Sequence, residues 1–198
     1  MNSPRLSADA RREQILEVAI NVFGRAGYYG ASMNDIADAA GVTKPVLYQH
    51  FDSKHYLYLE LISSTAEGLR EAIRVAVGGR MTGREQLEAA FQAYFEFFEQ
   101  DPGHFRVLYG EGVRSDPAFT EQLIALEVEM TAFTAELITI PSLEQSDKLL
   151  FAYGISGLLE SSVRRWSEEE DRRDAKEVAL LTAELVWRGL RGAGSIRH

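Results

Sequence analysis

Residues 32–54 constrain the fold of this chain more than any other stretch, because they read as two short helices joined by a tight turn. Ser32 and Asp35 have the spacing of a capping box, which predicts that a helix begins here and runs over residues 33–40. Gly41 stands where a left-handed residue ends a helix at little conformational cost. This arrangement predicts the first half of a helix-turn-helix.

The second helix of the stretch follows Thr43, a candidate cap, and it accepts Pro45 because first-turn amides need no acceptor within the helix. The two helices are predicted to close on each other through a shared apolar set: Ile36, Ala37, Ala40, Val42, Leu47 and Phe51. A helix this short is not stable alone, so its apolar side must be packed and its other side is left exposed. Major-groove recognition needs polar donors and a small apolar contact near the helix start, and Lys44, Gln49 and Pro45 supply them.

The stretch also matches a known family signature in its turn, core and polar positions together. The matching residues are Ser32, Ile36, Ala37, Ala40, Gly41, Val42, Thr43, Leu47, Tyr48, His50, Phe51 and Lys54. The segment therefore resembles the DNA-binding domain of the tetracycline-repressor (TetR) family. The alternative is a generic helical hairpin packed in a bundle, which does not explain an exposed Tyr, His and Lys at these offsets.

The resemblance implies a homodimeric regulator, in most cases a repressor, that leaves a palindromic operator on double-stranded DNA when a small molecule binds. By position in the family motif, Lys44, Pro45 and Gln49 would face base edges, and Asn34 would contact a base or a phosphate. The residues that would contact phosphates are Ser32, Thr43, Tyr48, His50 and Lys54. In the family, the helix after this segment couples ligand occupancy to the spacing of the two DNA-binding heads.

The charge distribution agrees with DNA binding once the chain is divided. The net charge is −9, yet residues 1–54 hold equal numbers of Lys/Arg and Asp/Glu, so all of the acidic excess lies beyond them. Such an asymmetry holds the rest of the protein away from phosphates and turns the balanced part towards them.

Helical periodicity continues through the whole chain, and no strand pattern or repeat interrupts it. Seven further helices are predicted. Three have clear start or stop signals: residues 8–26 lie between the cap Ser7 and Gly27, residues 54–77 follow Asp52 or Ser53 as cap, and residues 82–100 begin with a Thr82–Glu85 capping box. A short helix follows Asp101, and the last three cover residues 117–137, 143–166 and 173–191. The expected fold is therefore all-α, with about nine helices. Residues 1–54 are expected to form the three-helix DNA-binding domain, and residues 55–198 a larger ligand-binding and dimerisation domain.

Aromatic residues in the middle helices are either a packed core or the lining of an apolar cavity. The candidates for ligand contact are Phe91, Tyr94, Phe95, Phe98, Phe105, Tyr109, Phe133 and Tyr153. Members of the TetR family generally hold a ligand among these helices. Residues 90–113, together with the motif before them, resemble actinobacterial members that sense long-chain acyl-coenzyme A. We therefore expect an apolar effector of the fatty-acyl or acyl-CoA type.

The last two predicted helices carry apolar stripes interrupted by Gly154 and Gly157, which allow close helix approach. Two such helices from each of two chains would form a four-helix bundle, so we expect a homodimer. Packing within one chain is the alternative for these stripes.

Other classes of protein fit the sequence less well. The Asp52–His55 and Asp101–His104 pairs lack the further ligands of a hydrolytic or metal site, and the chain has no phosphate-binding loop, so we expect neither an enzyme nor a metal or cofactor. No apolar run reaches the length of a membrane span and no signal peptide is evident, which predicts a cytoplasmic protein without membrane contact. A helical lipid- or drug-binding protein without DNA function is the alternative.

Overall fold

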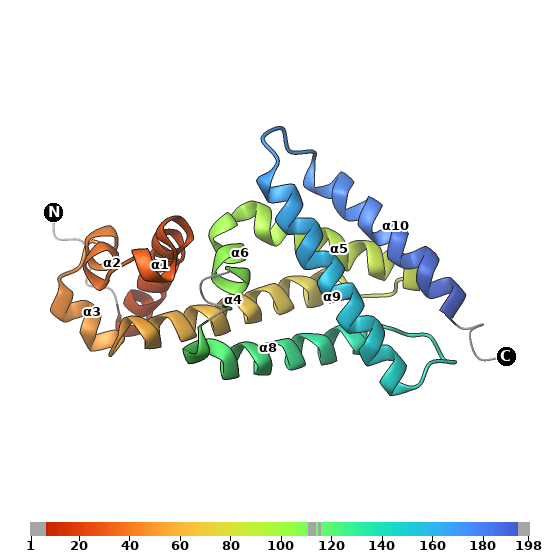
Figure 1. Ribbon diagram of the computed structural model, residues 1–198, viewed down its shortest axis with the longest axis horizontal. Coiled ribbons are helices and arrows are strands. Elements are labelled where there is room, and N and C mark those ends of the chain that lie inside the picture. Colours follow the sequence, from red (N-terminus) through yellow and green to blue (C-terminus); the bar gives the residue numbers. More distant parts are fainter. Residues whose placement is uncertain (1–6, 111–113, 115, 194–198) are drawn as a thin grey trace. The chain divides into compact units, whose positions relative to one another are not determined.

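The computed structural model describes residues 7–110, 114 and 116–193, and every regular element in this part of the chain is an α-helix (Figure 1). The helices are α1 (Ala8–Gly30), α2 (Met33–Ala39), α3 (Lys44–His50), α4 (Lys54–Ala76), α5 (Gly83–Gln100), α6 (Pro102–Tyr109), α8 (Pro117–Glu136), α9 (Gln145–Glu168) and α10 (Ala175–Ala193). The predicted all-α fold is confirmed, and within the described residues the predicted helix boundaries are met to within a few positions.

The chain divides into two compact units. The first holds residues through Thr65 together with Gly103–Gln122, so most of α6 belongs to the same unit as α1, α2 and α3. The second holds Ala66–Pro102 and the residues from Leu123 onward. Helices α4 and α8 contribute residues to both units.

Local caps form the helix-turn-helix as the sequence predicts. The Ser32 hydroxyl accepts from the Asp35 amide and the Asp35 carboxylate accepts from the Ser32 amide, which is the expected capping box. Gly41 has a φ of 64°, the left-handed conformation that ends α2. Thr43 occupies the N-cap position of α3, but its side chain makes no capping hydrogen bond, so the predicted cap is wrong in this detail.

The helix after the motif begins at a serine cap. Ser53 Oγ accepts a hydrogen bond of 3.0 Å from the Tyr56 amide, so Ser53 takes the cap role for which Asp52 was the other candidate. The Thr82–Glu85 capping box predicted for α5 is also present. These caps were predictable from the sequence because each involves residues within one helical turn of each other.

The first unit has an aromatic core around Tyr58. Its ring packs at 4.8 Å from Phe23, 5.0 Å from Tyr28 and 5.3 Å from Phe119 between ring centroids. Burial raises the pKa of the Tyr58 phenol, which donates to the Val107 carbonyl at 3.2 Å. The core therefore joins α1 and α4 to α6 and the start of α8.

Helices α1 and α6 approach each other at two glycines. A Cβ added to Gly24 would lie 2.7 Å from the Cα of Gly103, a distance that backbone atoms do not permit. Arg106 of α6 donates to the Gly24 carbonyl beside this contact. Side chains larger than hydrogen are thus excluded at the crossing.

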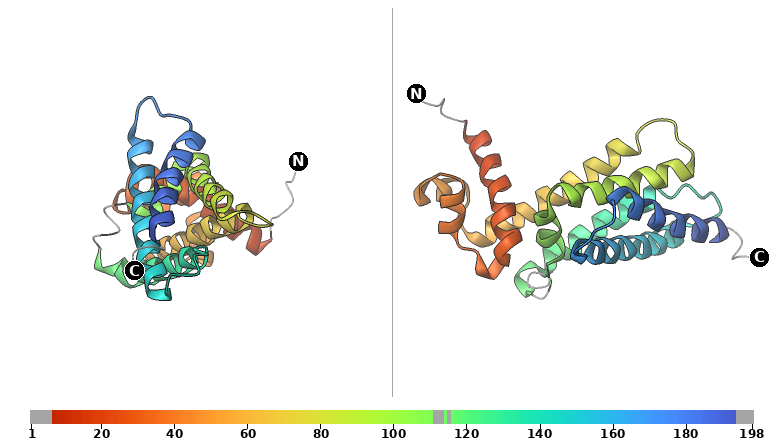
Figure 2. Two further views of the ribbon diagram at one scale, coloured as in Figure 1. Left: turned by 90° about the vertical axis from the view of Figure 1, so that its right-hand side faces the viewer. Right: turned by 90° about the horizontal axis from the view of Figure 1, so that it is seen from above.

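The second unit packs α5 against α10 and α9, and Figures 1 and 2 both show α9 and α10 as neighbouring helices. Phe95 of α5 lies 5.8 Å from Trp166 of α9 between ring centroids, and Tyr94 lies 5.0 Å from Phe98. Arg84 of α5 forms ion pairs with Glu88 at 2.7 Å and with Glu184 of α10 at 2.8 Å. Apolar packing thus holds these helices together, and ion pairs bridge them at the surface.

Candidate functional site

One face of α3 is exposed and the opposite face is buried. Leu47 is fully buried, as is Phe51 directly after the helix. Thr43, Lys44, Pro45 and Gln49 are exposed, as is Tyr48 at 40% of its surface, and His50 is half-buried. The α3 residues predicted to face DNA therefore gather on the side of the helix that the chain leaves open.

The exposed face of α3 carries positive charge and hydrogen-bonding groups at its N-terminal end. The Lys44 ammonium lies 5.9 Å from the centroid of the Tyr48 ring, so the two side chains share one surface. The Thr43 hydroxyl, which makes no capping bond, is exposed beside them. Ammonium, hydroxyl, phenol and amide groups on one short helix suit contacts to phosphates and base edges.

The start of α2 adds two further predicted DNA contacts, Ser32 and Asn34, and both are exposed. The Ser32 hydroxyl also donates to the Asp35 carboxylate at 2.7 Å, so its proton is already engaged in the capping box. The hydrogen bonds from the Ser32 hydroxyl and amide lower the pKa of the Asp35 carboxyl. To donate to a phosphate, the Ser32 hydroxyl would have to give up its hydrogen bond to the Asp35 carboxylate.

Lys54 is held by the first unit itself. Its ammonium donates to the Tyr28 carbonyl at 2.9 Å and to the Ala31 carbonyl at 3.0 Å, and it lies 4.4 Å from the centroid of the Tyr28 ring. These partners lie at the end of α1 and just before α2, so Lys54 ties the start of α4 to the junction between α1 and α2. An ammonium has three N–H donors, which leaves one for the phosphate contact that the sequence predicts.

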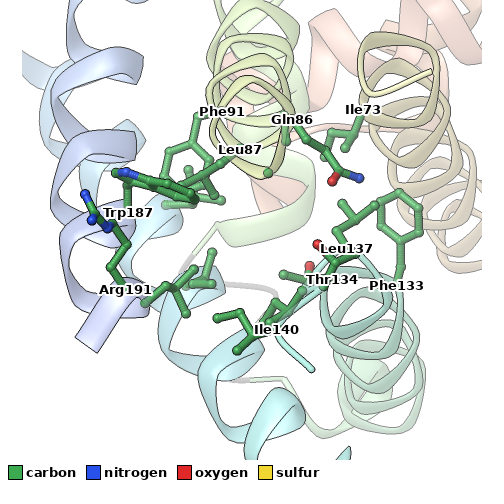
Figure 3. Close-up of a pocket in the computed structure, with 17 residues that line it drawn as sticks. Ile73, Gln86, Leu87, Phe91, Phe133, Thr134, Leu137, Ile140, Trp187 and Arg191 are labelled. Atoms are coloured by element: carbon green, nitrogen blue, oxygen red, sulfur yellow. The ribbon is translucent and has the colours of Figure 1, made fainter. Parts of the chain in front are cut away.

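The second unit contains a cavity of about 240 Å³. Its walls come from α4, α5, the end of α8 with the segment after it, α9 and α10 (Figure 3). The lining residues are Ile73, Gly83, Gln86, Leu87, Ala90, Phe91, Phe133, Thr134, Leu137, Ile138, Thr139, Ile140, Ile155, Leu159, Trp187, Leu190 and Arg191. Most of these side chains are apolar, so the cavity suits a hydrocarbon group.

Only part of the predicted ligand set lines this cavity. Phe91 and Phe133 are in its wall. Tyr94, Phe95 and Phe98 are buried among other aromatic rings of the second unit, and Tyr153 is exposed on α9. The two remaining residues belong to α6 in the first unit, where the rings of Phe105 and Tyr109 lie 5.0 Å apart.

Most of the cavity lining was not predicted from the sequence, including Trp187, Arg191 and residues 137–140. The only signals available for these were a lone tryptophan in an amphipathic helix and a short apolar run, and both are common in packed cores. Which apolar residues border a space is decided by the packing of several helices, so periodicity along one helix does not identify them.

Helices α9 and α10 carry large apolar side chains on their exposed surfaces. Leu150 is 69% exposed, Tyr153 45%, Leu181 56% and Leu185 63%. A Cβ added to Gly154 or Gly157 would meet no atom of the chain within 4 Å. The surface that these side chains and glycines form is therefore open to another molecule.

Comparison with known proteins finds a family match over the segment that contains α3. Residues 15–61 match the family described as bacterial regulatory proteins, tetR family. Over 187 residues the chain is 34% identical to the HTH-type transcriptional activator FasR of Mycolicibacterium smegmatis, a match covering 94% of this chain and 85% of that protein. The chain belongs to the tetR family. It is therefore a DNA-binding transcriptional regulator and not an enzyme.

Solved structures of other transcriptional regulators share the fold. A TetR-like transcriptional regulator from Rhodococcus sp. RHA1 matches with a TM-score of 0.77 at 29% identity, covering 95% of this chain and 100% of that one. The transcriptional regulator FadR from Bacillus subtilis, solved in complex with stearoyl-CoA, matches with a TM-score of 0.77 at 19% identity, covering 88% and 96%. At the lower identity the likeness shows the fold alone.

Two other structural features are absent from the residues that the structure describes. No helix there is long and apolar enough to cross a membrane. Within the same residues, no group of three His, Asp or Glu side chains stands close enough together to hold a metal ion.

Proposed function

We propose that this protein is a dimeric transcriptional regulator whose affinity for DNA is set by an apolar, fatty-acyl-type effector bound in the cavity of the second unit. The observation that carries the proposal is the lining of that cavity, in which apolar side chains from five helices surround about 240 Å³. Apolar walls of this kind suit the hydrocarbon chain of a fatty-acyl group.

The neighbour FadR supports an acyl effector, since its structure holds stearoyl-CoA within the same fold. The stretch of this chain that resembles acyl-CoA-sensing regulators includes Phe91, which lines the cavity. An apolar tail with an activated or free carboxyl group is the ligand class that both observations favour.

We assign DNA recognition to the exposed face of α3. Lys44, Pro45 and Gln49 would contact base edges, since all three are exposed on one short helix. Asn34 would contact a base or a phosphate, and the phosphate contacts would come from Ser32, Thr43, Tyr48, His50 and Lys54. In this assignment residues 1–54 bind DNA, and residues 55–198 bind the ligand and the partner chain.

The partner is proposed to be a second copy of the chain, docked on the exposed apolar surface of α9 and α10. Leu150, Leu181 and Leu185 are each more than half exposed, which is unfavourable for a lone chain in water. The open glycines of α9 allow another helix to approach closely. Two-fold symmetry of the dimer would match a palindromic operator.

Helix α4 gives the effector a route to the DNA-binding residues. Ile73 near its end lines the cavity, and Lys54 at its start donates to carbonyls at the end of α1 and just before α2. A ligand that displaces Ile73 would therefore move a helix tied to the DNA-binding residues. The cavity and the DNA-binding residues would be coupled if the ligand binds more tightly when α4 is displaced than when it is not.

The sign of regulation stays a prediction. The family resemblance of the sequence predicts a repressor, whereas the relative FasR is a transcriptional activator. A reporter gene placed behind the operator, measured with and without the regulator, distinguishes the two.

The proposal is tested by titrating a protein–operator complex with acyl-CoAs of increasing chain length. The operator is first recovered by selection from randomised DNA, and binding is followed by fluorescence anisotropy. We expect octanoyl-, decanoyl- or stearoyl-CoA to change operator affinity by about 5- to 150-fold, the usual range of allosteric coupling, and free coenzyme A to leave it unchanged. If no acyl-CoA changes operator affinity or the thermal stability of the protein, the acyl effector is excluded.

A further inference from the structure

Arg191 is the only charged residue among the seventeen that line the cavity. It belongs to the last turn of α10 and is exposed. Figure 3 shows its side chain beside the indole of Trp187, at the edge of the apolar walls. Arg191 therefore places a charge at the solvent-exposed margin of the lining.

Other arginines near this edge are already paired. Arg84, next to the lining residue Gly83, forms ion pairs with Glu88 and Glu184. Arg188 also pairs with Glu184, at 2.6 Å. Within the part of the chain that the structure describes, Arg191 forms no such pair.

The remaining polar groups of the cavity are neutral. Thr134 donates its hydroxyl proton to the Met130 carbonyl at 2.9 Å. The polar groups that remain to contact a ligand are mainly the Gln86 amide and the Thr139 hydroxyl. In Figure 3 the Gln86 side chain lies near Ile73 and Leu137, on a different side of the cavity from Arg191. The lining is therefore apolar inside, with one positive charge at one edge.

We infer that the cavity takes an amphipathic ligand whose apolar tail lies among its walls and whose anionic group is held by Arg191. The inference rests on the proposed function and adds the charge and orientation of the ligand. A guanidinium presents paired N–H donors that fit the oxygens of a carboxylate or a phosphate. The shared chemistry is an oxyanion, supplied either by a free fatty acid or by the phosphates of an acyl-CoA.

Arg191 also has an ordinary structural use, because a cation in the last turn of a helix favourably meets the helix dipole. That role predicts a change in stability but no preference between charged and neutral ligands. The experiment must therefore compare ligands of one chain length that differ only in charge.

The test measures binding of decanoic acid, 1-decanol and decanoyl-CoA to the full chain by isothermal titration calorimetry at pH 7.5. The variants are Arg191→Gln, which removes the charge, and Arg191→Lys, which keeps the charge without the paired donors. Arg84→Gln is the matched control, since Arg84 lies next to a lining residue but is paired elsewhere. Circular dichroism confirms that each variant is folded.

We expect the unmodified protein to bind decanoic acid more tightly than 1-decanol. Arg191→Gln should weaken the binding of the acid by about threefold to tenfold, as for a charged contact at a partly exposed site, and leave the alcohol unchanged. Arg191→Lys should keep part of the preference, and Arg84→Gln all of it. If only decanoyl-CoA shows the dependence on Arg191, the oxyanion is a phosphate.

Equal binding of acid and alcohol, with no dependence of decanoyl-CoA on Arg191, would overturn the inference but leave the proposed function standing. If Arg191→Gln weakened the binding of all three ligands equally, the inference would also be overturned, because that result shows a structural role for Arg191. Absence of binding by every ligand would remove the proposed function together with the inference.

Discussion

Lys54 combines a structural role with a predicted DNA contact, and the two can be separated. Replacing Lys54 by Met keeps the length of the side chain but leaves the Tyr28 and Ala31 carbonyls without their donor. We expect Lys54→Met to lower the free energy of unfolding by about 1–3 kcal/mol. If the third N–H contacts a phosphate, the slope of log affinity against log salt should also fall by about one.

Thermal unfolding and salt-dependent operator binding check this prediction. Lys44→Met is the matched control: Lys44 is exposed on α3, so its loss should weaken DNA binding without changing stability. An unchanged melting temperature in Lys54→Met would contradict a stabilising tie between α4 and the junction of α1 and α2. An unchanged salt slope would remove the phosphate role alone.

Lys44 is expected to read a base. Lys44→Ala should reduce discrimination at one base pair of the operator by about 1–3 kcal/mol. Anisotropy titrations against single-base variants of the operator measure this loss. Equal weakening on every sequence, including random DNA, would show instead that Lys44 contacts a phosphate.

Residues whose partners lie within one helical turn were predictable from the sequence, and those with distant partners were not. The Ser32–Asp35 and Thr82–Glu85 capping boxes depend on spacing alone. The bonds of Lys54 join residues that are 26 and 23 positions apart, so only the folded chain brings them together.

At the scale of elements, the crossing of α1 and α6 is the most restrictive contact of the first unit. Gly24→Ala would place a methyl group 2.7 Å from the backbone of Gly103, so one helix must move. We expect a loss of about 1–3 kcal/mol, the usual cost of overpacking. Chemical denaturation of the two variants Gly24→Ala and Gly30→Ala tests this.

Gly30→Ala is the control on the same helix, because a Cβ there would meet only the Ala26 side chain, at 3.5 Å. It should be neutral or slightly stabilising, since alanine restricts the unfolded chain. Equal stability of the two variants would mean that α6 yields freely at this crossing.

Helices were predictable as elements because each carries its own apolar period and its own start and stop signals. Gly27, with a φ of 70°, interrupts α1 where the sequence predicts its end, although the chain resumes a helical turn to Gly30. The cavity was not predictable in this way. Its walls come from five helices, and the aromatic stripe of α5 was mostly used for packing, as Phe95 against Trp166 shows.

At the scale of the whole molecule, the proposed dimer depends on the exposed surface of α9 and α10. Leu185→Glu places a charge where the partner chain would bury a side chain, so the protein should become monomeric and lose operator affinity. Sedimentation velocity measures the change in mass. Val128→Glu is the control, since Val128 is 54% exposed on α8 and lies outside this surface.

A monomeric Val128→Glu variant would move the interface to α8. A dimeric Leu185→Glu variant with full operator affinity would contradict the proposed surface. Both variants remain informative because an exposed substitution in a helix changes stability little.

The link between cavity and operator is tested most directly by filling the cavity. Ala90 lines it, and Ala90→Phe should occupy the space that an acyl chain would take. Operator affinity is measured for the unmodified protein and for Ala90→Phe, each with and without saturating decanoyl-CoA. We predict a change of about 5- to 150-fold for the unmodified protein and none for Ala90→Phe; an equal change in both proteins would contradict control through this cavity.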